Sequence, residues 1–289
     1  MTARKFCFFV LLSLVPMPSV AAEVFELHED VYHKNKPRVK RVLESFHPDS
    51  TAWVYKSRHN GLKDRKHYNR SRDNILMLPD TARRDLTLIV WLHGLGGFSE
   101  KTFKRVYRQV SLVTDREHSV AVVIPEMPWS INTTTKRSRQ GRVWTKKDSF
   151  RGFVEDTLEI LRWHYLIMRE EGLGDVEVVV VGHSAGGSAI ASASIEGSVC
   201  KLPITAVVWS DATYGSWLRR AHRGCLGREE IETIVLVRKW DKPHHRAAKF
   251  LKSLRNHSYD FRVLPRREFR HSRIGNEALR LSDLFPIGC

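Results

Sequence analysis

The residue best suited to nucleophilic chemistry is Ser184, which stands in the pentapeptide Gly-His-Ser-Ala-Gly at 182–186. An apolar stretch at 176–181 precedes it and is typical of a buried strand, whereas the small residues at 185–195 indicate a helix. So sharp a strand-to-helix turn strains the serine backbone and leaves no room for bulk at 182 or 186. It presents the hydroxyl at a helix N-terminus, where developing negative charge is favoured. We therefore expect Ser184 to act as a nucleophile.

Strands and helices alternate along the rest of the chain. Continuous apolar runs predict strands buried on both faces, at 86–92, 120–124, 176–181, 204–210, 231–237 and 261–264. Apolar residues at helical spacing and small-residue stretches predict helices at 99–114, 153–170, 185–195, 247–254 and 276–284. Two further strands are expected at 53–56 and 75–78. This alternation predicts an α/β fold with a doubly wound, mostly parallel sheet and helices on both faces.

In this setting the pentapeptide resembles the nucleophile turn of the α/β-hydrolase superfamily, and the order of elements over 50–285 is similar to that family. The sequence His93-Gly-Leu-Gly-Gly97 follows strand 86–92, where the family has its oxyanion loop. The resemblance implies that the backbone N–H groups of Ala185 and Leu95 bind the oxyanion of a tetrahedral intermediate. His93 itself is interpreted as a structural hydrogen-bonding residue rather than a base.

The family order of catalytic residues is nucleophile, acid, base. Asp241 follows strand 231–237, where the family has its acid, and His271 follows strand 261–264, where it has its base. The implied triad is Ser184, His271 and Asp241, in which His271 takes the serine proton and the carboxylate orients the imidazole. Asp211 ends strand 204–210 at the same edge of the sheet and is the alternative acid. By position alone we favour Asp241.

Two more histidines, His244 and His245, lie close to Asp241 in the sequence. We interpret them as exposed polar residues at the start of a helix. Their spacing with Asp241 matches no standard metal site, so neither a metal nor another cofactor is expected.

The long segment 126–150 is basic and contains tryptophan. Loops at the carboxyl ends of the strands border the site in this class of fold. The candidate rim residues, which would recognise an anionic group of the substrate, are Trp129, Arg139, Arg142 and Trp144. The alternative is a solvated basic loop with no role in recognition.

The overall charge is strongly positive, at +16 from 48 Lys and Arg against 32 Asp and Glu. Such a surface attracts anions, and the basic stretch 34–72 suggests contact with an anionic envelope surface. Nucleic acid is an unlikely partner because the chain has a secretory start and no recognisable nucleic-acid module.

The N-terminus has the layout of a secretory signal peptide, with a positive start, an apolar stretch at 6–15 and small residues ending at Ala22. We divide the chain into a signal peptide at 1–22, a polar basic segment at 23–50 and an α/β-hydrolase domain at 51–289. The protein is expected to be secreted or periplasmic, with no transmembrane segment after cleavage.

Removal of the signal peptide leaves three of the four cysteines, Cys200, Cys225 and Cys289. One disulfide is expected in an oxidising compartment. Cys200–Cys225 is the first choice because the chain between them can return to the same end of the sheet, and Cys289 is the competing partner.

These features together predict a serine hydrolase that cleaves a small-molecule or polymer-linked ester, with anionic substrates suited to the basic loop. Two alternatives stay open. One is an amidase or peptidase acting on a cell-wall-type substrate, and the other is a catalytically inactive, polyanion-binding protein on the same fold. The intact pentapeptide, together with a candidate base and acid, favours the ester hydrolase.

Overall fold

The computed structural model describes residues 50–60, 73–94, 100–114, 119–127, 140–228, 230–254 and 259–280, with side chains left out at 50, 100, 111–114 and 140–142. The predicted signal peptide and nearly all of the basic segment 23–50 lie outside these residues, as do Cys7 and Cys289. None of the described helices is long and apolar enough to cross a bilayer.

An eight-stranded sheet runs through the described part of the chain in the order β1-β2-β4-β3-β5-β6-β7-β8. The strands are β1 (Ser50–Lys56), β2 (Asp73–Pro79), β3 (Leu86–Leu92), β4 (Val120–Pro125), β5 (Val176–His183), β6 (Ile204–Ser210), β7 (Glu232–Arg238) and β8 (Asp260–Leu264). β1 and β2 are antiparallel, whereas β3 to β8 are parallel. The predicted strands are confirmed, and so is the mostly parallel sheet.

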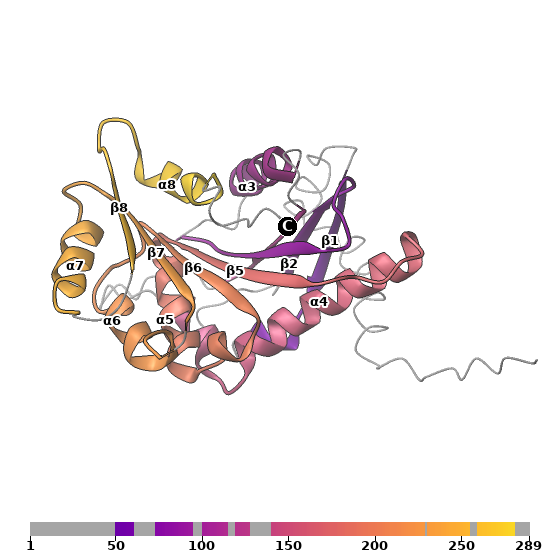
Figure 1. Ribbon diagram of the computed structural model, residues 1–289, viewed down its shortest axis with the longest axis horizontal. Coiled ribbons are helices and arrows are strands. Elements are labelled where there is room, and N and C mark those ends of the chain that lie inside the picture. The colour runs from indigo at the N-terminus through magenta and orange to yellow at the C-terminus, as the bar shows by residue number, and fades with distance from the viewer. Residues whose placement is uncertain are drawn as a thin grey trace, which may run out of the picture.

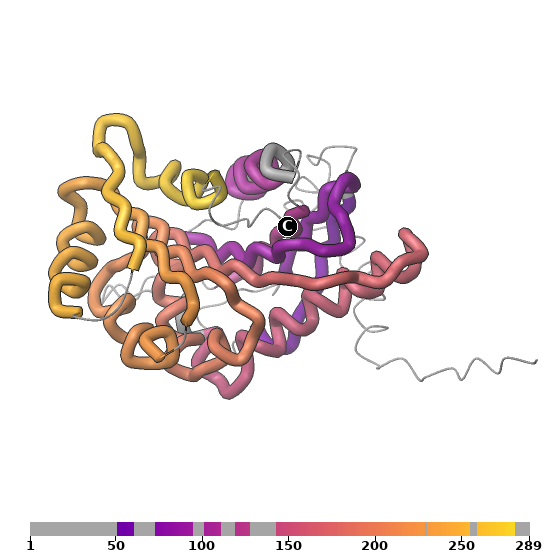
Figure 2. The backbone as a smooth tube through the Cα atoms, in the orientation of Figure 1, coloured from indigo at the N-terminus to yellow at the C-terminus, as the bar shows by residue number. Residues whose placement is uncertain are grey.

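Helices cover both faces of the sheet, which confirms the doubly wound α/β architecture (Figure 1). They are α3 (Glu100–Thr114), α4 (Ser149–Met168), α5 (Gly187–Glu196), α6 (Trp217–Ala221), α7 (Lys242–Leu251) and α8 (His271–Ala278). α3 and α8 lie on one face, and α4, α5 and α6 lie on the other. α3 and α8 are far apart in the sequence but side by side in space (Figure 2).

The central strand β3 shows how the sequence builds two core layers. All seven of its residues are buried. Ile89 and Trp91 belong to the layer that includes Phe103 of α3 and Ile274 of α8. Leu88 and Val90 belong to the layer under α4 and α5. Because successive side chains of a strand alternate between the faces of the sheet, a continuous apolar run is needed to fill both layers.

Three helices begin earlier than the sequence pattern indicates. α4 starts at Ser149 rather than 153, α7 at Lys242 rather than 247, and α8 at His271 rather than 276. The first turn of α7 carries Pro243, whose fixed φ suits a helix start although it adds nothing to the apolar pattern. The early start of α8 places His271 in the first turn of a helix instead of in the preceding loop.

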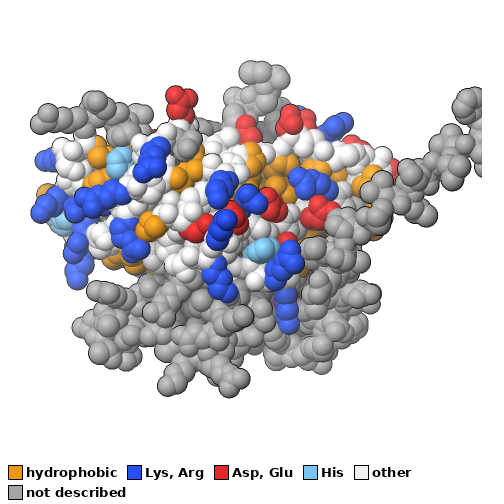
Figure 3. All heavy atoms as spheres, turned by 90° about the horizontal axis from the view of Figure 1, so that it is seen from below, with side chains coloured by type: hydrophobic (Ala, Val, Ile, Leu, Met, Phe, Trp, Pro, Cys, Tyr) orange, Lys and Arg blue, Asp and Glu red, His pale blue; other side chains and the backbone are white. Residues whose placement is uncertain are grey.

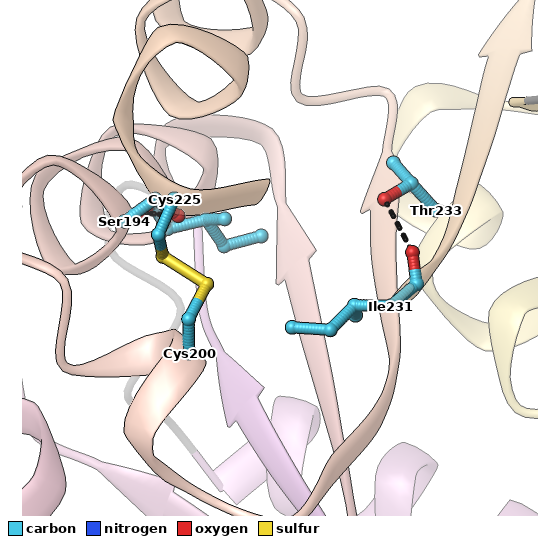
Figure 4. Close-up of a disulfide and its surroundings, with 6 residues drawn as sticks. Ser194, Cys200, Cys225, Ile231 and Thr233 are labelled. Atoms are coloured by element: carbon cyan, nitrogen blue, oxygen red, sulfur yellow. Dashed lines mark hydrogen bonds between the residues drawn. A yellow bond between two sulfur atoms is a disulfide. The ribbon is translucent and has the colours of Figure 1, made fainter. Parts of the chain in front are cut away.

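The disulfide joins Cys200 to Cys225 with their Cα atoms 6.1 Å apart, which confirms the first predicted pairing. Cys200 lies in the 3-10 turn Val199–Lys201 and Cys225 in the π-helical turn His222–Leu226. Figure 4 shows the bond between these two turns, with Ser194 of α5 beside it. The bridge therefore ties the end of α6 to the segment that leads into β6.

Positive side chains gather at one end of the face seen in Figure 3, the end that carries α6 and α7. The exposed cations of these two helices are Arg219, Arg220, Lys242, Arg246 and Lys249. The remaining part of that face carries both signs of charge. The net positive charge is thus unevenly spread over the described surface.

Candidate active site

Ser184 lies in the turn between β5 and α5, in the short 3-10 segment Ser184–Gly186. Its φ is 53°, in the left-handed region that a residue with a side chain rarely adopts. A Cβ at Gly182 would lie 2.5 Å from Cδ1 of Ile190 in α5, and one at Gly186 would strike the carbonyl oxygen of Leu92 in β3. The predicted strain at the serine is therefore confirmed, and so is the lack of room at 186, where the obstacle is backbone. At 182 the nearest atom is the end of the Ile190 side chain, which a methyl group would displace.

Ser184, His271 and Asp211 form a continuous hydrogen-bonded chain. The Oγ of Ser184 is 3.0 Å from Nε2 of His271, and Nδ1 of His271 is 2.5 Å from Oδ2 of Asp211. Asp211 is fully buried, whereas 36% of the His271 side chain is exposed. With its Nδ1–H donated to the carboxylate, the imidazole offers Nε2 as the acceptor for the serine proton.

Asp211 is held by the backbone around it. It follows β6 directly with φ 47°, its N–H donates to the carbonyl of Leu236 at 2.7 Å, and its Oδ1 accepts the N–H of Arg238 at 3.5 Å. Because β6 lies next to β5 in the sheet, the left-handed turn brings the carboxylate to the same edge as Ser184.

Ser184 after β5, Asp211 after β6 and His271 at the start of α8 follow one another along the chain in the order serine, carboxylate, histidine, on a doubly wound sheet. The chain has the α/β-hydrolase fold. The carboxylate that contacts His271 follows β6, one strand earlier than the strand that precedes Asp241.

The preference for Asp241 over Asp211 as the partner of His271 was wrong. Asp241 instead accepts a hydrogen bond from Nε of Arg238 at 2.5 Å and lies 3.9 Å from Nε of Arg266. It stands in extended conformation just before α7. Asp241 follows β7, one strand farther from β5 than Asp211, and its carboxylate is engaged by the two arginines.

The ring of His183 lies beside the imidazole of His271. Its Nε2 is 2.9 Å from the backbone carbonyl oxygen of His271, and the two rings lie 4.9 Å apart. Burial, with the nearby His271 adding to it, lowers the pKa of His183 to about 4. The ring is therefore neutral near pH 7, and its Nε2–H donates to that carbonyl.

His93 has the structural role expected of it. Its Nε2 accepts the N–H of Met127 at 3.1 Å, so its Nδ1–H donates to the carbonyl of Gly94 at 2.7 Å. A Cβ at Gly94 would lie 3.1 Å from the Cβ of Ser184, which shows how closely this loop approaches the serine. Ala185 is buried directly after Ser184. Leu95 lies outside the described residues.

The predicted rim is described only in part. Trp129, Arg139 and the side chain of Arg142 lie outside the description. Trp144 is not a rim residue, because it is fully buried with its ring 5.3 Å from each of the rings of Phe150 and Phe153. Trp144 therefore packs against α4 in the core, and the prediction that it is a rim residue was wrong.

The other histidines near Asp241 are surface residues. His244 stacks on Phe261 with the ring centroids 6.1 Å apart, and His245 is exposed. No cluster of three or more metal-ligating side chains occurs among the residues that the structure describes.

Sequence reasoning missed the residues that surround the serine and the histidine. The ring of Tyr214 lies edge-on to that of His271, with centroids 6.4 Å apart, and burial raises the pKa of Tyr214 to about 12. A cavity of about 440 Å³ opens beside Ser184 between α3 and α8. It is lined by Trp91, His93, Gly94, Thr102, Arg105, Val106, His183, Ser184, His271, Ser272, Gly275 and Asn276. No motif marks Thr102 or Arg105, which appear in the sequence as ordinary helix-surface residues.

No family model and no curated protein matches this sequence. Solved structures similar to this chain include Esterase B from Lactobacillus rhamnosis, which is 13% identical with a TM-score of 0.46 over 88% of this chain and 87% of that chain. A cold-adapted esterase from an Arctic intertidal metagenomic library is 11% identical with a TM-score of 0.48, over 83% and 95% of the two chains. A poly(3-hydroxybutyrate) depolymerase from Bordetella parapertussis is 16% identical with a TM-score of 0.47, over 85% and 93%.

Proposed function

We propose that this protein is a serine hydrolase that cleaves carboxylic esters through an acyl-enzyme. The observation that supports this function is the hydrogen-bonded chain from Ser184 through His271 to Asp211, with its 3.0 Å and 2.5 Å contacts. A serine hydroxyl is a weak nucleophile until an adjacent base removes its proton. His271 is within reach to do so, and the buried carboxylate holds the imidazole in the tautomer that can accept that proton.

The reaction has two halves. In the first, Oγ of Ser184 attacks the ester carbonyl as its proton passes to Nε2 of His271, which then protonates the alcohol as the ester C–O bond breaks. In the second, a water loses a proton to His271 and attacks the acyl-enzyme, and His271 returns that proton to Ser184 as the acid departs. Asp211 stays ionised and stabilises the imidazolium in both halves.

The oxyanion of each tetrahedral intermediate is bound by the backbone N–H groups of Ala185 and Leu95. The close approach of Gly94 to Ser184 supports this assignment, because it brings the start of the His93–Gly97 loop against the serine. Two donors fixed in the backbone need no reorganisation as charge develops on the oxygen.

We also propose that this protein is exported across a membrane. The disulfide Cys200–Cys225 supports it, since such bonds persist in oxidising compartments. The signal-peptide pattern at 1–22 supports it independently. The mature enzyme would begin near residue 23.

Hydrolysis of 4-nitrophenyl butyrate by the purified mature protein tests the proposal. We expect turnover by the wild type and losses of at least about 10³-fold in kcat for Ser184→Ala and His271→Ala, because both remove a member of the same unit. A matched control is Ser194→Ala, which changes a fully buried serine of α5 whose hydroxyl donates to the carbonyl oxygen of Ile190 in the same helix. A folded wild type without turnover, or variants that retain it, would refute the function.

A further inference from the structure

The cavity beside Ser184 has both apolar and polar walls. Its apolar part comes from Trp91 of β3 and Val106 of α3, and its polar part from Thr102, Arg105 and Asn276. A volume of about 440 Å³ is within the range of small-molecule sites. The group that enters is therefore in contact with the α3–α8 pair while its ester lies at the serine.

Arg105 is the one permanently charged side chain among the described residues that line this cavity, and none of those residues is acidic. Histidine is the other titratable type in the lining. Of these, His183 has a pKa near 4 and is neutral at pH 7, while His93 has both ring nitrogens in hydrogen bonds with the backbone. The third histidine, His271, has its Nδ1 bonded to Asp211. Arg105 therefore supplies the one permanent positive charge among the described residues of the lining.

The guanidinium of Arg105 is available for a ligand. Its Nη1 donates to the carbonyl oxygen of Ser272 at 3.5 Å, a long bond that uses one of five N–H donors. No ion pair joins Arg105 to a carboxylate in the part of the chain that the structure describes. The bond to α8 nevertheless fixes the side chain across the gap between the two helices.

The α3–α8 pair that frames the cavity is itself held in place. Arg280, which follows α8, donates to Gln109 of α3 at 3.1 Å. Ile274 of α8 and Val106 of α3 share one core layer. These contacts position the helix that carries Arg105 before the substrate arrives, which lowers the entropy cost of binding.

Further cations lie on the same two elements. Lys101 and Arg108 are exposed on α3, and Arg270 and Arg273 are exposed at the start of α8. They do not line the cavity. The described acidic side chain of α8, Glu277, pairs with Arg280. The exposed charge of these two elements is therefore mainly positive and attracts anions.

We infer that Arg105 is a specificity-determining residue that selects esters carrying a carboxylate on the part of the substrate that enters the α3–α8 cavity. This inference rests on the proposed ester hydrolysis at Ser184 and names the substrate class for it. The planar guanidinium binds a carboxylate through two parallel hydrogen bonds, which a neutral isostere cannot form.

The test compares pairs of esters that differ only in this charge. One pair carries it on the acyl side, as 4-nitrophenyl hydrogen adipate against 4-nitrophenyl methyl adipate. The other carries it on the alcohol side, as the butyrate of 4-hydroxybenzoic acid against the butyrate of its methyl ester. The quantity measured is the ratio of kcat/KM for the charged ester to that for the neutral one.

We expect a ratio above one for at least one pair in the wild type, and a fall of about tenfold or more in Arg105→Gln, which corresponds to about 1.4 kcal/mol. Arg105→Lys keeps the positive charge but cannot form the two parallel hydrogen bonds, so it should give an intermediate ratio. Raising the salt concentration should lower the wild-type ratio because the site is partly exposed. Arg108→Gln, one turn along the same helix and outside the cavity, removes the same charge without touching the lining, and it should lower the ratio far less than Arg105→Gln does.

An unchanged ratio in Arg105→Gln for both pairs would overturn the inference, and so would an equal fall in Arg108→Gln. Calorimetric binding of adipate to the wild type and to Arg105→Gln separates this inference from the proposed function. Binding that depends on Arg105 in a protein without esterase activity would refute ester hydrolysis and keep the anion site. Esterase activity that does not depend on Arg105 would support ester hydrolysis and overturn the inference about Arg105.

Discussion

Replacing Asp211 by asparagine tests how much the negative charge beside His271 contributes to catalysis. The substitution keeps the shape of a fully buried side chain and removes its negative charge. Opposite charges about 4 Å apart interact by about 4 kcal/mol at the effective dielectric of a protein site. If the imidazolium loses that stabilisation in the transition state, kcat should fall by about 10³-fold.

An asparagine can also bond to Nδ1 through the wrong tautomer, which raises the expected loss towards ~10⁴-fold, the size found when the acid of a serine-protease triad is made neutral. The assay is kcat for 4-nitrophenyl butyrate, with circular dichroism and the thermal midpoint to establish that each variant is folded.

Asp241→Asn is the matched control, because that carboxylate pairs with Arg238 and Arg266 and does not contact His271. We expect it to keep kcat within about threefold of the wild type, as is usual for a largely structural ion pair. The assignment of the acid would be refuted by an Asp211→Asn variant within tenfold of the wild type, or by a larger loss in Asp241→Asn.

Three other outcomes follow from the structure. The pKa of His183 is lowered from 6.5 to about 4. Between these pH values the unfolded state binds more protons than the folded state. The free energy of unfolding should therefore fall by about 3 kcal/mol as pH drops from 7 to 4. Urea titrations should show this slope flattened in His183→Asn, and an equally steep slope there would contradict the assignment. Replacing Cys200 and Cys225 together by alanine opens a loop of 25 residues and should lower the unfolding free energy by about 3.5 kcal/mol, with little effect on kcat for the folded fraction. Gly186→Ala places a methyl group against the Leu92 carbonyl and should cost about 2–3 kcal/mol in urea unfolding, whereas Gly197→Ala, with nothing within 4 Å, should lose only the smaller amount due to its positive φ.

The sheet could be predicted from the sequence because parallel strands buried on both faces need continuous apolar runs. The run at β3 and the run at β6 gave both bounds of their strands. Helix starts were harder, since Pro243 and His271 belong to first turns that carry no apolar periodicity. Ser184 was identifiable because the strand, the two glycines and the helix are all local in sequence.

The acid could not be chosen in the same way. Asp211 directly follows β6 and Asp241 comes three residues after the end of β7, both at the same edge of the sheet. They differ in whether the backbone turns left-handed at the aspartate and in which cations lie nearby. Asp211 has φ 47° and Asp241 has φ −90°. The partner of Asp241 is Arg238, three residues away, and i, i+3 spacing alone does not say that an ion pair forms.

Buried tryptophans are equally ambiguous when they lie in a basic segment. Trp144 was assigned to a rim because its neighbours in sequence are charged, yet it packs on the phenylalanines of α4. Arg105 was not singled out, since it lies on an amphipathic helix where no local pattern distinguishes it from a solvated surface residue. Its place beside the serine depends on how α3 and α8 pack together, and no local pattern encodes that packing.

The most direct test of the central claim is labelling of the mature protein with a fluorophosphonate, followed by mass spectrometry of the modified peptide. We expect the wild type to be labelled at Ser184 and Ser184→Ala to remain unlabelled. His271→Ala and Asp211→Asn should be labelled far more slowly, and Asp241→Asn at the rate of the wild type. A folded wild type that takes no label, or label on a residue other than Ser184, would contradict the claim that this serine is the activated nucleophile.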